Sequence, residues 1–416
     1  MFSYLKKTDS ALWHLVHREA RRQKDSIDLI ASENEAPEGV LELLGSVLTN
    51  KYSEGYPAKR YYPGNEIIDS IELLAHKRAR ALFGLSERWH VNAQAYSGAI
   101  ANLAVYLGLL EKGDTILSLS LDAGGHLSHG AKASFVSTFF TIVHYGVDAR
   151  YVIDYGGLER AIQKHKPKLV IAGASAYPRA IDFARIARYA HARGAFVLAD
   201  ISHYAGLISA GVYPSPFDHS DVVMTTTHKS LFGPRAALIF CDTQSALARR
   251  KKISIGHAID KAIFPGLQGG PHNNTIAAIA HGLLLSKKSK GYFKRVLANA
   301  LSLCAACTRE GFTVVGRTTD SHLMLLDMRP LGIDGAAAEK LLERAGILAN
   351  RNTIAGDLRA LFPSAIRVGT YAVTARGMRE RDMNIVARFL GDILIKRLSP
   401  ERVRKNVLRF LSRFSV

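Results

Sequence analysis

The sequence predicts an α/β fold in which a mainly parallel sheet carries helices on both faces and a smaller α+β domain follows at the C-terminal end. Two observations support this prediction. From about residue 80 to residue 240, short apolar segments of strand length alternate with helical patterns, and this alternation is typical of parallel strands joined by helical crossovers. After Gly270-Pro271, helix and strand come in a shorter, mixed order, which is typical of a separate α+β unit.

The individual elements follow from periodicity and from residues that cap helices. Residues 10–24 have the pattern of an amphipathic helix capped by Asp9 or Ser10, and Asp182 is placed to cap a crossover helix over residues 182–193. The expected apolar strands of the sheet are residues 114–119, 168–172, 195–199 and 221–224. In the C-terminal part we expect a long helical stretch at 275–307, strands at 312–315, 322–327 and 365–368, and a helix at 336–345. We therefore divide the chain into an N-terminal arm (1–30), a large domain (31–280) and a small domain (281–416).

The composition limits the class of protein. Of the 416 residues, 48% are hydrophobic and 22% are charged, as in an ordinary soluble globular protein. No apolar run is long enough to cross a membrane, and the first residues lack the apolar core of a signal peptide. Because the chain has only three cysteines, we expect a reducing, cytoplasmic location. Cys304 and Cys307 form a single CxxC without further ligands, so we expect them to pack in a helix and predict no metal site.

The net charge of +19 is unusual. Much of it gathers in three clusters, at residues 249–252, 287–290 and 402–413. One interpretation is a protein that binds nucleic acid or another anionic surface. Basic residues interspersed with apolar ones along a helix favour a solvated surface instead, and no basic motif interleaved with aromatic residues is present. Nucleic-acid binding is therefore kept as a remote alternative.

The most informative stretch is residues 222–235, where an apolar strand runs into a threonine cluster and delivers Lys229 to a turn. A lysine amine held in a partly desolvated pocket has a lowered pKa and can form a Schiff base with an aldehyde. An earlier strand ends in Asp200, and a carboxylate there is what a pyridinium nitrogen needs as a partner. Taken singly, such residues more often cap a helix or point to water. The pair in this order, with His203 and His228 beside it, predicts a pyridoxal phosphate site.

Three further segments are suited to parts of such a cofactor. A small turn at residues 97–99 precedes an apolar helix, where free backbone N–H groups and the helix dipole would face a phosphate. A second glycine turn at residues 268–271 could lend N–H groups to an anion. His126 lies in the loop 122–130, from which an imidazole could stack on a pyridine ring. Each segment also has an ordinary interpretation as a helix start or a loop, so only the combination is specific.

Taken together, these segments resemble the serine hydroxymethyltransferase family, pyridoxal phosphate enzymes of fold type I. The resemblance covers nearly the whole chain and includes, in the family's order, residues 29–34, 48–57, 59–62, 124–127, 225–229, 264–271 and 366–370. It implies an aspartate-aminotransferase-like fold with a mainly parallel, seven-stranded sheet. It also implies reversible transfer of the serine hydroxymethyl carbon to tetrahydrofolate, with pyridoxal 5'-phosphate as cofactor, in a homodimer whose active site is shared between subunits.

Carried over residue by residue, the resemblance implies a role for each matching position. Lys229 would bind the cofactor aldehyde and Asp200 would pair with the ring nitrogen. The other expected cofactor contacts are Tyr52 (from a second subunit), Ser97, Gly98, Ala99, His126, Ser175, His203, Gly269 and Gly270. The amino acid would be bound by Ser32, Tyr62 and Arg367, and the catalytic set would be Lys229, Glu54, His228 and Tyr62, with Glu54 as acid/base at the substrate hydroxyl or the folate. The folate site would include Glu54, Tyr61, Leu121, Gly125, Leu127 and Asn352.

The chain departs from the family pattern at several positions. Ala99 stands where a serine would offer a hydroxyl to the phosphate, Leu267 replaces a glycine, and the loop after Asn352 lacks the usual proline. Relatives of this fold act as threonine aldolases or transaldolases, which break the same type of carbon–carbon bond without folate. The catalytic positions are compatible with those enzymes too, so a threonine aldolase or transaldolase is the alternative function.

Overall fold

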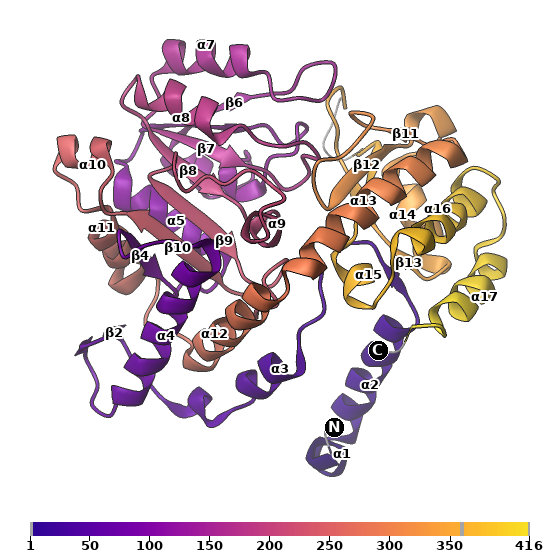
Figure 1. Cartoon of the computed structure of the whole chain (residues 1–416), viewed down its shortest axis with the longest axis horizontal. Helices are drawn as coiled ribbons and strands as arrows, with labels where there is room; N and C mark the ends of the chain where they lie inside the picture. The colour runs from indigo at the N-terminus through magenta and orange to yellow at the C-terminus, as the bar shows by residue number, and fades with distance from the viewer. Residues whose placement is uncertain (1–2, 358–361, 415–416) are drawn as a thin grey trace.

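The structure is a computed structural model of the chain, and it describes residues 3–357 and 362–414. Figure 1 shows two lobes, with the large sheet in the purple and magenta lobe and the helices α13 (Lys290–Glu310) and α16 (Glu380–Leu394) in the orange and yellow lobe. Within the described residues, no helix has the length and apolar character that crossing a membrane requires.

The large lobe is built on a seven-stranded sheet with the order β4-β10-β9-β8-β7-β5-β6. Its strands are β4 (Trp89–Asn92), β5 (Thr115–Leu119), β6 (Thr141–Tyr145), β7 (Leu169–Gly173), β8 (Phe196–Asp200), β9 (Val222–Thr226) and β10 (Ala237–Asp242). All neighbours pair in parallel except that β10 runs antiparallel to both β4 and β9. The predicted mainly parallel, seven-stranded sheet is therefore confirmed, and the four expected strands correspond to β5, β7, β8 and β9.

Apolar side chains cover both faces of this sheet. In β8, Val197 and Ala199 face one core while Phe196 and Leu198 face the other, as the two-residue period of a strand requires. The first face is covered by α4 (Glu66–Phe83), α7 (Tyr155–His165), α8 (Phe183–His191), α9 (Ala205–Ser209) and α12 (Asn273–Lys288). The second face is covered by α5 (Gly98–Leu109), α6 (Val136–Phe139), α10 (Ala246–Lys251) and α11 (Ile255–Lys261). The predicted cap of α8 is confirmed, because the Asp182 carboxylate accepts the N–H of Arg185.

The carboxyl ends of the parallel strands meet at one edge of the sheet. β8 ends at Asp200, which lies in register with Gly173 of β7 and Met224 of β9. β9 ends at Thr226, three residues before Lys229. Ligands of open α/β sheets bind beyond this edge, so the topology brings the two key residues to the place where a ligand is expected.

The C-terminal lobe has its own core. Its antiparallel sheet has the order β11-β12-β15-β14, with strands β11 (Thr313–Val314), β12 (Leu323–Asp327), β14 (Asn350–Asn352) and β15 (Ala365–Gly369). The helices α13, α14 (Gly335–Arg344), α16 and α17 (Pro400–Leu411) pack on it. The short strand β1 (Ile27–Asp28) pairs in parallel with β13 (Ile347–Leu348), so that Ile27 and Leu29 join this core. The division into an arm, a large and a small domain stays a prediction.

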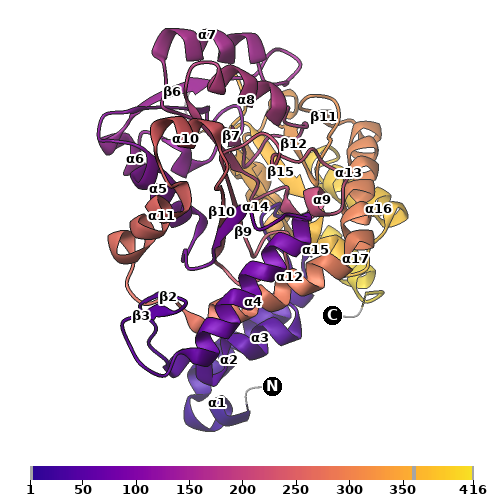
Figure 2. The same cartoon turned by 60° about the vertical axis from the view of Figure 1, so that its left-hand side comes forward.

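The predicted helical stretch over residues 275–307 is helical in the structure except for one break at Ser289. The structure has two helices, α12 and α13, which end and begin on either side of Ser289. Because α12 packs on α4 of the large lobe and α13 packs on α16 of the other lobe, the break lets one stretch of chain serve two cores. Figure 2 shows the two helices passing from one lobe to the other.

The N-terminal segment is largely uncovered. It consists of α1 (Ser3–Thr8) and α2 (Ser10–Lys24), and the predicted cap is Asp9, whose carboxylate accepts the N–H of Leu12. No residue of α2 is buried, and its apolar side chains Leu12 and Leu15 are exposed. In Figures 1 and 2, α1 and α2 project from the body of the molecule. The remaining short elements are α3 (Glu38–Leu44), η1 (Val47–Asn50), β2 (Gly55–Tyr56), β3 (Lys59–Arg60), η2 (Leu127–His129), η3 (Ala262–Leu267), η4 (Arg329–Leu331) and α15 (Tyr371–Ala375).

Candidate active site

Lys229 lies in a tight turn beyond β9. The turn is closed by the N–H of Gly233 on the carbonyl of Thr227, at 3.0 Å. The lysine is only 9% exposed, and its amine makes no hydrogen bond or ion pair with any residue that the structure describes. The pKa of Lys229 falls from 10.5 to about 8, chiefly because burial penalises the ammonium, with Arg367 adding to the fall and Asp200 opposing it. The site therefore contains a buried amine that is neutral in a useful fraction of molecules at ordinary pH.

Asp200 is held as an anion by four hydrogen bonds. Its Oδ1 accepts the N–H and the hydroxyl of Ser202, at 3.1 and 2.6 Å. Its Oδ2 lies 2.9 Å from Nε2 of His129 and 3.1 Å from the amide nitrogen of Asn102. Burial alone would raise the pKa of Asp200, but the bond from His129 and the charge of Lys229 bring it well below its usual value. A carboxylate fixed in this way keeps its charge and its direction at the end of β8.

Arg367 is a buried cation. It is 7% exposed, and no carboxylate of the described residues lies within ion-pair distance of it. Its Nη1 donates to the carbonyl and to the hydroxyl of Ser175, at 2.8 and 3.1 Å, and its Nε donates to the side chain of Asn350 at 3.0 Å. Burial lowers its pKa to about 10, so the guanidinium stays charged at neutral pH. A buried, oriented and unpaired guanidinium is suited to bind a carboxylate.

Four histidines near this site are neutral. Burial is the main reason that the pKa is lowered to about 4 in His126, to about 3 in His228 and His322, and well below its usual value in His203. The positive charge of Lys229 lowers all four further. The His203 ring lies 3.4 Å from the hydroxyl of Ser175 and stacks on His322. These rings can therefore stack or donate one hydrogen bond, but they do not add charge.

Two predicted loops meet beside these groups. The carbonyl of Gly124 accepts the N–H groups of Ser175 and Ala176, at 2.7 and 3.0 Å, and so joins the His126 loop to the segment after β7. Gly124 has φ +103°, and a Cβ there would lie 2.7 Å from the Ala176 backbone, so only glycine allows this approach. Leu121, Gly125 and Leu127 belong to the same loop, and Leu127 is exposed.

The two anion-binding turns predicted from the sequence also meet. The helix α5 begins at Gly98, and a Cβ there would lie 2.7 Å from Thr226, so glycine lets this helix start close against the end of β9. The hydroxyl of Tyr96 donates to the carbonyl of Gly270, and the N–H of Tyr96 donates to the side chain of Gln268. The Gly269-Gly270 turn is thus fixed beside the residue that precedes the α5 start.

Tyr52 and Glu54 lie over the second glycine turn. A Cβ on Gly270 would be 3.4 Å from the Tyr52 ring, and one on Gly269 would be 3.3 Å from the Glu54 carboxylate. Three tyrosines of this region are unusually open for aromatic residues, with exposures of 58% for Tyr52, 75% for Tyr61 and 43% for Tyr62. The predicted acid/base Glu54 and three predicted cofactor contacts, Tyr52, Gly269 and Gly270, are therefore neighbours on an open face of the chain.

Two predicted residues, Ser32 and Asn352, make no hydrogen bond to the residues described above. Asn352 lies on β14 and donates to the carbonyl of Thr353. Ser32 is half-buried and follows Ala31, whose carbonyl is 3.0 Å from Nε2 of His322. The strand pairing still brings both segments close to Arg367. Asn352 lies on β14, which pairs with β15, the strand of Arg367. The segment of Ser32 is held at the end of β15 by the N–H of Gly369, which donates to the carbonyl of Leu29.

Several supporting residues were not predicted from the sequence. They are the Asp200 partners Asn102, His129 and Ser202, the Arg367 partner Asn350, and His322. For His129 a signal existed, because it lies three residues after His126 in the same glycine-rich loop. Ser202 is also local, two residues after Asp200, but a serine there has no distinctive pattern. For Asn102, Asn350 and His322 the sequence offers no local pattern, since their partners are distant along the chain.

The chain matches known proteins over nearly its full length. The family model of serine hydroxymethyltransferase matches residues 5–390. A serine hydroxymethyltransferase of Desulfotalea psychrophila is 46% identical over 393 residues, which is 94% of this chain and 89% of that protein. A serine hydroxymethyltransferase of Coprothermobacter proteolyticus is 46% identical over 410 residues, which is 98% of this chain and 95% of that protein. This chain belongs to the serine hydroxymethyltransferase family, whose enzymes depend on pyridoxal phosphate and use tetrahydrofolate as co-substrate.

Proposed function

We propose that this protein reversibly transfers the hydroxymethyl carbon of serine to tetrahydrofolate, giving glycine and 5,10-methylenetetrahydrofolate. One observation carries the assignment of the site: two buried cations, Lys229 and Arg367, have no ion-pair partner among the described residues, and a fixed carboxylate, Asp200, lies in the same buried region. Family membership selects the folate-dependent transferase over a threonine aldolase of the same fold.

The residues present fit pyridoxal phosphate. Lys229 offers an amine without a partner, and Asp200 offers an anion for the ring nitrogen. Two more buried polar atoms, Oγ1 of Thr226 and Nδ1 of His228, have no hydrogen-bond partner in the part of the chain that the structure describes. Buried polar atoms of this kind are normally satisfied, so they support a polar ligand between β9 and the start of α5. When bound, the cofactor draws off the electron pair left on the substrate Cα as a bond to that carbon breaks.

Around that cofactor, we assign the protein groups as follows. Lys229 would hold the aldehyde, Asp200 would keep the proton on the ring nitrogen, and His126 would lie against the ring. The remaining cofactor contacts are assigned to Tyr52, Ser97, Gly98, Ala99, Ser175, His203, Gly269 and Gly270. A hydrogen-bonded anion is a good partner for a pyridinium proton because its own pKa is low, so the proton stays on the nitrogen.

The amino-acid carboxylate is assigned to Arg367 and Ser32. Nη1 and Nε of Arg367 donate hydrogen bonds to Ser175 and Asn350, so the orientation of the guanidinium is fixed before a ligand binds. Glu54, supported by Tyr62, is assigned to proton transfer at the substrate hydroxyl or at the folate. We assign the folate site to Glu54, Tyr61, Leu121, Gly125, Leu127 and Asn352, and His228 to the catalytic set.

The active form is proposed to be a homodimer with a shared site. The exposed tyrosines 52, 61 and 62 and the uncovered apolar side of α2 support this proposal, because open apolar surface on this scale is typical of an interface. Mixing Lys229→Ala protein with Glu54→Ala protein tests it. If Glu54 serves the partner's site, random hybrids restore about a quarter of wild-type activity, since half of the dimers are hybrids with one intact site. No recovery after subunit exchange would contradict a shared site.

The reaction is tested by measuring glycine formation from serine with and without tetrahydrofolate, beside threonine with an acceptor aldehyde. We expect serine turnover to depend on the folate. Serine turnover that ignores folate while threonine is consumed would overturn the transferase assignment. A cytoplasmic location is proposed as well, supported by three cysteines that are all buried and unpaired.

A further inference from the structure

We propose that Arg60 is a positioning residue that fixes the backbone on both sides of Glu54 and so aims Glu54 and Tyr61 at the substrate and the folate. The inference rests on the proposed function, because it concerns the site to which that function assigns these two residues. Arg60 itself would touch neither substrate nor cofactor, since its side chain is 4% exposed.

The guanidinium of Arg60 binds the carbonyls that flank Glu54. Its Nη1 donates to the carbonyl of Ser53 at 3.0 Å and to the carbonyl of Gly55 at 2.6 Å. The carbonyl of Glu54 itself accepts the N–H of Tyr61 at 3.0 Å. Three consecutive carbonyls are therefore held, and the direction in which the Glu54 side chain leaves the backbone is fixed with them.

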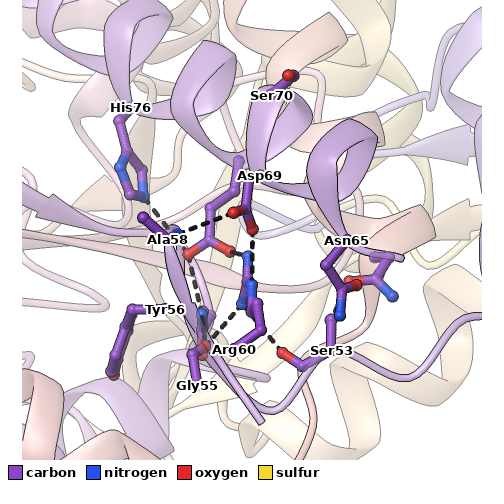
Figure 3. A network of polar contacts seen from close by, with 12 residues as sticks. Ser53, Gly55, Tyr56, Ala58, Arg60, Asn65, Asp69, Ser70 and His76 are labelled. Atoms are coloured by element: carbon purple, nitrogen blue, oxygen red, sulfur yellow. Dashed lines mark hydrogen bonds and ion pairs between the residues drawn. The ribbon is translucent and has the colours of Figure 1, made fainter. Parts of the chain in front are cut away.

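The other side of the guanidinium is anchored to α4. Its Nε donates to Asp69 at 2.8 Å, and its Nη2 donates to Glu72 at 2.6 Å. The second oxygen of Asp69 accepts the N–H of Ala58 at the tip of the β2–β3 hairpin, at 2.8 Å. Figure 3 shows Arg60 between the hairpin and the helix that carries Asp69. A planar group with donors on several edges can make all these bonds at once, which a lysine ammonium cannot.

The contact between Arg60 and α4 is rigid because Glu72 is buried and is also bonded to a second side chain, Gln94. Glu72 is 1% exposed, and its other oxygen accepts the amide of Gln94 at 2.9 Å. The same amide of Gln94 donates to the carbonyl of Gly55 at 3.0 Å, so a second side chain supports the same point of the hairpin. Gly55 has φ +93°, and a Cβ there would lie 2.3 Å from the carbonyl of Lys59, so the hairpin cannot close with a larger residue.

The hydrogen bonds of Arg60 are better explained by a need to fix the geometry of the hairpin than by a gain in its stability. A hairpin with two-residue strands is marginal alone, and Tyr52, Tyr61 and Tyr62 beside it are exposed rather than packed. Burying an arginine with two carboxylates is rarely a net gain in stability, and its best-attested use is to fix one geometry. A fixed geometry matters here because a displacement of about 1 Å of a catalytic group can reduce the rate on the order of a hundredfold.

The test compares Arg60→Lys with the wild-type protein. Lysine keeps the buried positive charge but loses the fork, so the fold is retained while the hairpin loosens. We expect amide hydrogen exchange in residues 53–61 to become about tenfold faster or more, without any requirement for substrate or cofactor. We expect kcat/KM for tetrahydrofolate to fall on the order of tenfold to a hundredfold, while the glycine dissociation constant stays within about twofold.

The matched control is Arg88→Lys. Arg88 also binds a carboxylate through two nitrogens, Nε and Nη2 on Asp242 at 2.6 Å each, but it lies before β4 and does not contact the hairpin. This variant should change neither exchange in residues 53–61 nor the folate kinetics. If Arg60→Lys does not fold, Arg60→Gln combined with Glu72→Gln removes the cation together with its more deeply buried carboxylate and is expected to give the same two changes.

The outcomes separate this inference from the proposed function. If amide hydrogen exchange in residues 53–61 of Arg60→Lys is unchanged, Arg60 does not fix the hairpin backbone. Faster exchange with folate kinetics like those of the wild type overturns its role in catalysis. A wild-type protein that does not use tetrahydrofolate at all overturns the proposed function, and the exchange measurement then still decides whether Arg60 holds the hairpin. A merely structural role would lower the melting temperature without changing kcat/KM of the folded protein.

Discussion

Replacing Arg367 with alanine should chiefly weaken binding of the amino acid. The guanidinium is buried and lacks an acidic partner in the described residues, so its removal leaves no carboxylate stranded. The three hydrogen bonds that it loses end on Ser175 and Asn350, and both residues are only half-buried, so water can replace the lost donors. We therefore expect the variant to fold and to keep the cofactor.

The size of the effect follows from burial. Truncating one member of a buried, hydrogen-bonded charge pair costs about 2–5 kcal/mol. Because about 1.4 kcal/mol corresponds to a factor of ten, the glycine dissociation constant should rise from roughly 30-fold to several thousand-fold. The upper part of this range is favoured, because Arg367 is already oriented by Ser175 and Asn350 and spends little entropy on binding. Since its pKa is about 10, the wild-type affinity should hold up to that pH and fall above it.

The assay is a calorimetric titration of the cofactor-loaded protein with glycine and with serine. Arg351→Ala is the matched control, because Arg351 lies on the neighbouring strand β14 but is exposed and bonded to Glu339. Arg367→Lys should give an intermediate loss, since it keeps the charge but not the fork. If glycine and serine bind to Arg367→Ala within about twofold of their wild-type affinity, the assignment of the carboxylate site is wrong.

Three further predictions concern Lys229 and Asp200. Borohydride treatment of loaded wild-type protein should fix the cofactor to the denatured chain, and Lys229→Ala should retain none; retention by the variant would place the aldehyde on another amine. With the Lys229 pKa lowered to about 8, cofactor loading of the apo-protein should speed up about fivefold from pH 7 to pH 8 and level off above about pH 9 at roughly tenfold the pH 7 rate, because the neutral amine reacts; a rise that continues steadily to pH 10 would contradict the lowered pKa. His129→Phe removes a hydrogen bond that lowers the pKa of Asp200, so cofactor affinity should fall roughly ten- to a hundredfold in equilibrium dialysis; an unchanged affinity would show that Ser202 and Asn102 suffice.

The sequence identifies the residues at strand ends well, because the ends of parallel strands meet at one edge of the sheet. Asp200 and Lys229 could be paired for this reason before their contacts were known. It does not identify partners that depend on register. Asn350 rather than Asn352 supports Arg367, because β14 pairs with β15 so that Asn350 lies opposite Arg367. Both asparagines share one face of the strand, and only the register chooses between them.

Tertiary packing overrides local preference in the same way at Ser289. The sequence Lys287-Lys288-Ser289-Lys290-Gly291 contains a serine and a glycine, but these weak signals alone do not require a break in the helical pattern of residues 275–307. The break is set by the two cores on which α12 and α13 pack. Arg60 is a further case, because one arginine before two tyrosines has no local signature of a buried group bonded to α4.

The charges of the site explain why its ligands are anions. Lys229 and Arg367 are buried cations, and Asp200 is the one acidic group among the site residues named here that is buried with them. Their positive potential, together with burial, keeps His126, His203 and His322 neutral, so the imidazoles do not increase the excess of charge. An uncompensated charge in a buried site costs stability, and a phosphate and an amino-acid carboxylate would supply the missing negative charge. The same burial therefore favours a phosphorylated cofactor and an amino acid as ligands, and their binding should add stability to the fold.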